Sequence, residues 1–116
     1  MILVDTSVWV EHFRQGKIGL DTLLNDGQVM CHPFIAGELA CGNLRNRSQI
    51  LTLLNTLPMA LVADHEEVLQ LIEKYRLMGK GLGLIDMHLL ASSMLTNVPL
   101  WTLDKRLKRM SATLRR

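Results

Sequence analysis

The chain has 116 residues, 48% of them hydrophobic and 21% charged, and a formal net charge of +2. This length predicts one domain over residues 1–116 with a sizeable core, and the composition excludes a disordered chain. No apolar run is long enough to span a bilayer, and no basic region precedes the first apolar residues. We therefore expect a cytoplasmic protein with no membrane contact.

The first half of the chain alternates short apolar strands with helical patterns. A continuous apolar run at residues 1–4 predicts a strand buried on both faces, and helices follow at 7–14 and around 20–24. A second strand is expected at 29–32. Pro33 then suits the first turn of a helix that ends near residue 41.

In the second half, leucine spacing predicts a helix over 50–57, which Pro58 ends, and an apolar third strand over 59–63. Asp64 is expected to cap a long amphipathic helix that reaches residue 75. The glycine-rich turn at 79–83 has no P-loop pattern and is interpreted as a connector. A helix over 84–97, a strand over 99–102 and a basic helix from 105 complete the pattern.

This alternation predicts the α/β class, with a central, mostly parallel sheet and right-handed crossovers. Four strands are expected, and a fifth is conceivable around Thr113–Leu114. Ligands of open α/β sheets bind at the carboxyl edge of the strands. The residues that follow each strand are therefore the first candidates for a functional site.

Two aspartates stand directly after predicted strands. Asp5 follows the first strand and Asp104 follows the fourth. Each is also placed to cap the next helix, so neither one alone indicates a function. If the first and fourth strands are neighbours, these two side chains lie on either side of one crevice.

Two further carboxylates fall on apolar helical stripes. Glu38 is spaced three or four positions from Phe34, Ile35 and Cys41, and Asp86 is spaced in the same way from leucines. We therefore expect both side chains to face the core, where charges are rare without compensation. An ion pair with a buried cation is the ordinary explanation, but no basic residue shares either stripe.

A common site for Asp5, Glu38, Asp86 and Asp104 accounts for all four positions. A pair of like charges about 4 Å apart costs roughly 4 kcal/mol at an effective dielectric of about 20. A hard divalent cation such as Mg²⁺ or Mn²⁺ removes this repulsion and prefers oxygen ligands. Nearby hydroxyls can orient waters or carboxylates. They belong to Thr6, Ser7 and Thr102.

These motifs together resemble the PIN domain. They are Asp5-Thr6-Ser7 after an Ile-Leu-Val strand, Glu38 in IAGEL, Asp86 in LIDMHLLA and Asp104 in TLD. The resemblance covers nearly the whole chain, and the size is similar to VapC-type toxins of toxin–antitoxin pairs. It implies a three-layer α/β/α, Rossmann-like fold with strand order 3-2-1-4-5. Met87-His88 departs from the small residues common after the third acidic position, and the C-terminal strand looks short.

The resemblance also implies an activity and partners. VapC-type toxins are metal-dependent endoribonucleases, inhibited by a cognate antitoxin and usually dimeric, so transfer RNA or ribosomal RNA is the expected substrate. The four carboxylates would be the catalytic and Mg²⁺- or Mn²⁺-binding residues, with in-line attack leaving a 5′-phosphate. Candidate contacts to the RNA backbone are Arg14, Lys17, Arg45, Arg47, Lys105, Arg106, Lys108 and Arg109.

The basic residues near the C-terminus have two interpretations. Six of the 13 Lys and Arg residues fall in the last twelve positions, including Arg116. Such a cluster beside an acidic pocket suits a polyanion with a metal-held phosphate. A solvated helix face that improves solubility explains the same pattern.

Other functions fit the sequence less well. A receiver-like signalling domain needs adjacent acidic residues after the first strand, and Asp5 is followed by Thr-Ser. A D-x-D phosphatase needs an acid where Ser7 stands. A non-catalytic PIN scaffold that binds RNA or protein predicts a missing acidic residue. A zinc site of Cys31, His32 and Cys41 lacks paired C-x-x-C spacing, and the alternative is two reduced thiols.

Overall fold

A parallel sheet lies at the centre of the computed structural model, which describes residues 1–115; Arg116 of the basic tail lies outside the described residues. Its strands are β1 (Ile2–Val4), β2 (Val29–Met30) and β3 (Leu100–Trp101), in the order β2-β1-β3. Leu3 pairs with Met30 on one side and with Leu100 on the other. Leu3 and Val4 are fully buried, as predicted for a strand covered on both faces.

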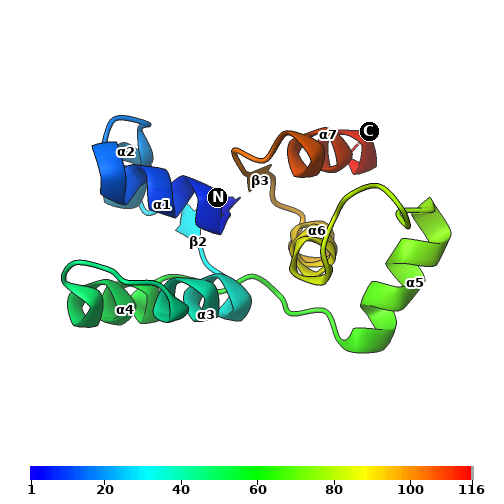
Figure 1. Ribbon diagram of the computed structural model, residues 1–116, viewed down its shortest axis with the longest axis horizontal. Coiled ribbons are helices and arrows are strands. Elements are labelled where there is room, and N and C mark those ends of the chain that lie inside the picture. Colours follow the sequence, from blue (N-terminus) through cyan, green and yellow to red (C-terminus); the bar gives the residue numbers. More distant parts are fainter. Residues whose placement is uncertain (116) are drawn as a thin grey trace.

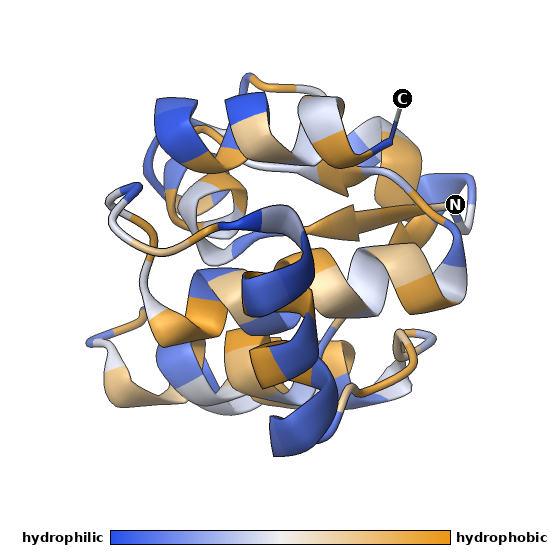
Figure 2. Cartoon of the chain, turned by 90° about the vertical axis from the view of Figure 1, so that its right-hand side faces the viewer, coloured by the Kyte–Doolittle hydropathy of each residue, from blue (hydrophilic) through white to orange (hydrophobic). Residues whose placement is uncertain are grey.

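Helices cover both faces of this sheet. Figure 1 shows α1, α2 and α7 on one side and α3, α4 and α6 on the other, with α5 packed beside α6. Figure 2 shows the apolar strands between these layers, with much of the hydrophilic helix surface turned outward. The predicted α/β class with a parallel sheet is therefore confirmed. The helices are α1 (Thr6–Gln15), α2 (Leu20–Asn25), α3 (Pro33–Cys41), α4 (Arg47–Thr56), α5 (His65–Tyr75), α6 (Leu84–Thr96) and α7 (Lys105–Leu114).

The sheet is smaller than the four or five strands predicted. Within residues 1–115, the segment expected as a strand at 59–63 contributes only one parallel bridge, between Met59 and Cys31. The pairing ends there because the chain after Cys31 turns into α3, with His32 as its N-cap and Pro33 as its first residue. The amide of Leu61 donates to Thr96 Oγ1 at 2.9 Å. This single bridge lies beyond β2, so the order of the first four segments agrees with the order that the resemblance implies.

The conceivable fifth strand at Thr113–Leu114 does not form, because both residues belong to α7. Leu107 and Ser111 form the buried side of this helix. Continuing the helix keeps the backbone of its last turn hydrogen-bonded, with Arg115 N donating to Ser111 O at 3.2 Å.

Local sequence signals explain where several helices begin and end. Asp64 and Glu67 form a capping box at the start of α5, with hydrogen bonds of 2.8 and 3.0 Å. Pro33 opens α3 as expected, while His32 Nδ1 accepts from the amide of Phe34 at 3.0 Å. Gly16, with φ +67°, ends α1 in the left-handed conformation that glycine tolerates best. No helix within residues 1–115 has the length and apolar character needed to cross a membrane.

Candidate active site

Asp5 is the buried centre of the candidate site. It follows β1, its amide donates to Trp101 O at 2.9 Å, and its side chain is only 7% exposed. One carboxylate oxygen, Oδ2, accepts from Ser7 Oγ at 2.8 Å and from Thr102 Oγ1 at 2.7 Å. Among residues 1–115, no donor is recorded for Oδ1. The side chain is thus held by one oxygen while the other remains available to a ligand.

The loop after β3 is tied to the end of β1 by the same hydroxyls. Ser7 Oγ accepts from the amide of Leu103 at 3.0 Å, and Thr102 Oγ1 accepts from the amide of Asp104 at 3.1 Å. The two hydroxyl oxygens are 3.3 Å apart. This network places Asp104 beside Asp5, as predicted from the neighbouring strands. It gives the predicted supporting residues Ser7 and Thr102 direct contacts with the site.

Asp104 also caps α7, which was the alternative explanation for its position. Its Oδ1 accepts from the amide of Leu107 at 3.0 Å, and its side chain is exposed. A cap uses one carboxylate oxygen, so capping and a role in the site are compatible.

Glu38 is exposed, and the prediction that it faces the core is wrong. The buried line of α3 runs through Ile35 and Leu39, whereas Phe34 is 40% exposed and Cys41 is exposed. Glu38 therefore shares the outer face of the helix with two of the apolar residues that suggested its burial.

The exposed carboxylate of Glu38 still reaches the site. Its Oε1 accepts from Thr6 Oγ1 at 2.8 Å, which joins α3 to the first turn of α1. Because Thr6 directly follows Asp5, this contact places Glu38 at the rim of the crevice. Thr6 thereby supports Glu38, not Asp5.

Asp86 is half-buried at the start of α6. Burial raises the pKa of its carboxyl above the usual range, and the charges of Asp5 and Asp104 raise it further. The amide of Gly83 donates to Asp86 Oδ2 at 3.0 Å and opposes this shift. Asp5 and Asp104 are thus near enough for their charges to affect the pKa of Asp86.

No basic side chain neutralises this group. Within residues 1–115, the only salt bridge joins Arg14 to Glu11, at 3.6 Å. The ordinary explanation for carboxylates on apolar stripes, pairing with a buried cation, is therefore excluded for Glu38 and Asp86. Each of the four acids instead accepts from a protein hydroxyl or amide.

The acids do not form a closed metal site in the described part of the chain, where no three His, Cys, Asp or Glu side chains are grouped closely enough to bind one ion. Two of the acids are engaged with neutral donors, Glu38 with the Thr6 hydroxyl and Asp86 with the Gly83 amide.

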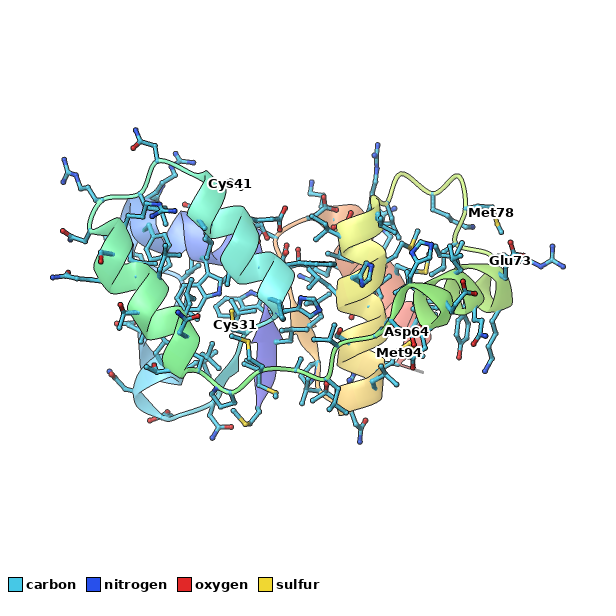
Figure 3. All side chains as sticks on the ribbon, turned by 90° about the horizontal axis from the view of Figure 1, so that it is seen from below. Cys31, Cys41, Asp64, Glu73, Met78 and Met94 are labelled. Carbon is cyan, nitrogen blue, oxygen red and sulfur yellow. The ribbon has the colours of Figure 1, made fainter. Side chains whose placement is uncertain are left out.

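The zinc alternative is excluded by the same observation, because it needs Cys31, His32 and Cys41 together. Figure 3 shows Cys31 in the interior and Cys41 at the far end of α3. Both thiols are free, as expected for reduced cysteines. His32 caps α3, and burial, with a smaller effect of His88, lowers its pKa to about 4.

The predicted RNA contacts fall in separate places. Arg14 and Arg45 line an apolar groove of about 660 Å³ between α1 and α4, which none of the four carboxylates lines. The side chain of Arg47 connects α4 to α3, because its guanidinium donates to Ala40 O at 2.9 and 3.3 Å. Lys17 is exposed in the loop after α1. The remaining candidates lie on α7 and are Lys105, Arg106, Lys108 and Arg109.

Sequence analysis missed the backbone amides that organise the crevice, those of Gly83, Leu103 and Asp104. Every residue carries an amide, so no residue type marks these donors. Only the Gly83–Asp86 spacing, which matches the N-cap and third position of a helix, gave a local signal.

Comparisons with known proteins agree with this geometry. The family model described as the PIN domain matches residues 2–112. Two curated relatives, both named Ribonuclease VapC32, come from Mycobacterium tuberculosis strains CDC 1551 / Oshkosh and ATCC 25618 / H37Rv. Each is 48% identical over 109 residues, which covers 93% of this chain and 88% of the relative.

Proposed function

The chain belongs to the PIN domain family, and from this membership we propose that it is a VapC-type endoribonuclease, the toxin of a toxin–antitoxin pair. The observation that carries the proposal is the crevice at the carboxyl edge of the sheet, where acidic side chains gather without a basic partner in residues 1–115. The name of its relatives, Ribonuclease VapC32, supports the same activity. On this proposal, residues 1–116 are one PIN domain.

The donor set fits a hard divalent cation. All four side chains offer carboxylate oxygens, which Mg²⁺ and Mn²⁺ prefer. Burial is the main cause of the raised pKa of Asp86, and the charges of Asp5 and Asp104, which a cation would offset, add to it. Asp5, Asp86 and Asp104 would hold the ion, with Glu38 at the rim binding it directly or through water. A bound Mg²⁺ or Mn²⁺ lowers the pKa of water and neutralises charge on the phosphate.

The protein's own groups orient the acids for this role. Ser7 and Thr102 fix one oxygen of Asp5 by hydrogen bonds of 2.8 and 2.7 Å, which leaves the other directed to the ligand. The amide of Gly83 sets the position of Asp86, and Thr6 holds Glu38 in reach of the crevice. We propose RNA hydrolysis that leaves a 5′-phosphate and a 3′-hydroxyl.

The proposal includes a substrate and partners. Transfer RNA or ribosomal RNA is the proposed substrate, and a cognate antitoxin the proposed inhibitor, both in the cytoplasm. A homodimer is proposed because large apolar side chains are exposed, among them Leu61 at 60% and Leu84 at 55%. Light scattering behind a sizing column gives the mass in solution, and a monomer at micromolar concentration would remove the dimer from the proposal.

The direct test is RNA cleavage by the purified chain and by an Asp5→Asn variant. We expect Mg²⁺- or Mn²⁺-dependent cleavage of transfer RNA or ribosomal RNA that EDTA stops, and no cleavage by the variant. Asp21→Asn is the matched control, because it removes an exposed acid on α2. Wild-type rates from Asp5→Asn would refute the role of Asp5. RNA binding without cleavage by the native chain would favour a non-catalytic scaffold.

A further inference from the structure

A basic pocket lies between the glycine-rich turn and α7. It has a volume of about 220 Å³ and is lined by Lys80, Leu82, Arg106, Arg109, Met110 and Thr113. The α7 residues in this set are spaced by three or four positions, so they form one face of the helix. Lys80 comes from the turn, which sequence analysis interpreted as a connector only.

The three cations of this pocket, Lys80, Arg106 and Arg109, form no ion pair with the described residues, 1–115. Three positive charges around one small space repel each other, so the pocket gains stability when an anion enters. Arginine and lysine both suit phosphate, arginine through paired N–H groups and lysine as a point charge.

Arg106 is held in place by the turn. A β-carbon at Gly81 would lie 2.6 Å from Arg106 Nη1 and 3.0 Å from its Cδ, so the arginine side chain crosses directly over the glycine. Gly81 also has φ +78°, a conformation that glycine adopts without strain. The turn thus positions a guanidinium that would otherwise be a flexible surface side chain.

The pocket is continuous with the acidic crevice through both of its elements. Gly83, at the end of the same turn, donates to Asp86, and Asp104 caps the helix that carries Arg106 and Arg109. The two sites thus share a turn and a helix, an arrangement that suits a chain of phosphates which contacts both. A single free anion would occupy only one of the two sites.

We propose that this pocket binds the RNA backbone phosphate next to the one that is cleaved. Lys80 and Arg109 are the cations that contact this phosphate, and Arg106 is positioned for the same phosphate by its packing over Gly81. This inference rests on the proposed ribonuclease function for the identity of the polyanion. The pocket offers cations that match phosphate oxygens, which every nucleotide of an RNA carries. It therefore contributes affinity and register but not sequence preference.

The first experiment measures RNA binding apart from cleavage. Fluorescence anisotropy of a labelled single-stranded RNA of about 12 nucleotides is recorded in EDTA at several salt concentrations for the full chain and for Lys80→Ala and Arg109→Ala. We expect each variant to bind roughly three- to tenfold more weakly and to reduce the salt slope by about 0.7. Lys74→Ala is the matched control, because it removes the same charge from an exposed position on α5 that is not among the candidate RNA contacts.

The second experiment leaves the charge unchanged. Gly81→Ala adds a methyl group that must push Arg106 aside, whereas Gly79→Ala, at φ +69°, has the same backbone strain but nothing within 4 Å. We expect Gly81→Ala to weaken RNA binding and Gly79→Ala to leave it near the native value. Circular dichroism melting checks that both variants fold.

Three results would overturn the proposal. They are equal losses from Lys80→Ala, Arg109→Ala and Lys74→Ala, equal effects of the two glycine variants, and a loss of binding to a polyglutamate peptide with RNA affinity unchanged. The last would assign the pocket to an acidic protein segment. Inorganic phosphate is added as a competitor. A pocket that binds one free anion would be saturated by it, whereas a pocket that needs the RNA chain would not. These experiments measure binding and not cleavage. Their results can therefore be interpreted even if the ribonuclease proposal fails.

Discussion

At the scale of single residues, the chemistry depends on a few hydroxyl and amide donors around Asp5. Its carboxylate is almost fully buried, yet it is stabilised by neutral donors and not by a cation. Hydrogen bonds from hydroxyls hold the charge without cancelling it. This arrangement keeps the negative potential that a metal ion requires.

Thr102→Val should show how much this orientation matters. The change keeps the shape of a side chain that is 3% exposed, but it removes the donor to Asp5 and the acceptor of the Asp104 amide. We expect kcat to fall about ten- to a hundredfold with little change in KM, and stability to fall by about 1–3 kcal/mol. Thr102→Ser keeps the hydroxyl and should restore both. If serine rescued stability but not kcat, orientation through this hydroxyl would be wrong.

Asp86→Asn should stabilise the metal-free protein at neutral pH. The folded-state pKa of Asp86 is raised, so the folded state loses stability relative to the unfolded chain as pH rises through the carboxyl range. Asparagine has no charge and can still accept from Gly83. Melting in EDTA at pH 4 and pH 7 measures this, and the advantage of the variant should grow with pH. A variant less stable than the native chain at pH 7 would contradict it.

At the scale of elements, α3 illustrates how a helix serves both the core and the site. Ile35 and Leu39 anchor it in the core, and Glu38 reaches the site from its outer face. Its first turn is capped by His32, which is fully buried and accepts from Phe34 through Nδ1. A cap that must accept a hydrogen bond works only with a neutral imidazole.

The cap makes the stability of the fold sensitive to acid. Burial lowers the folded-state pKa of His32 to about 4, while the unfolded value is 6.5. The unfolded chain therefore binds more protons between these values, and stability falls as pH drops from 6.5 toward 4, by about 3 kcal/mol in total. His32→Asn keeps a cap acceptor without titrating, so its urea-unfolding free energy should depend less on pH in this window.

The control for this variant is His65→Asn, which changes an exposed histidine at the start of α5. It should follow the native pH dependence. If His32→Asn lost stability on acidification as steeply as the native chain, His32 would not be the group responsible.

At the scale of the whole molecule, a net charge of +2 conceals two opposed regions. Acidic side chains gather at the carboxyl edge of the sheet, and unpaired cations lie next to them on α7 and the preceding turn. A bound divalent ion would convert the acidic region into a site for phosphate. The basic pocket already has the sign that RNA requires.

Metal binding should therefore stabilise the folded chain as a whole. At a free Mn²⁺ concentration about 100 times its Kd, the gain is about 2.7 kcal/mol, which raises Tm by about 10 °C. Scanning calorimetry with Mn²⁺ and then with excess EDTA tests this. The shift should be smaller in Asp5→Asn and unchanged in Asp21→Asn. An equal shift in all three proteins would place the ion elsewhere.

Much of the fold was predictable because its signals are local. The apolar run of β1, the Pro33 helix start and the Asp64 cap depend on residues within one or two turns. The number of strands was overestimated because an apolar segment such as 59–63 pairs only if a neighbouring backbone offers free amides and carbonyls. Beyond Cys31 the neighbouring backbone turns into α3 at His32 and Pro33, so it offers segment 59–63 only one bridge.

The sequence by itself determined that Asp5 and Asp104 each follow a strand, because an apolar run precedes each of them. Only the tertiary structure decided that these strands pair, that Glu38 lies on an exposed face, that Thr102 donates to Asp5 from 97 positions away, and that Arg106 packs over Gly81. Helical periodicity gives the angle between side chains on one helix, but which face is buried depends on what the rest of the chain places against it.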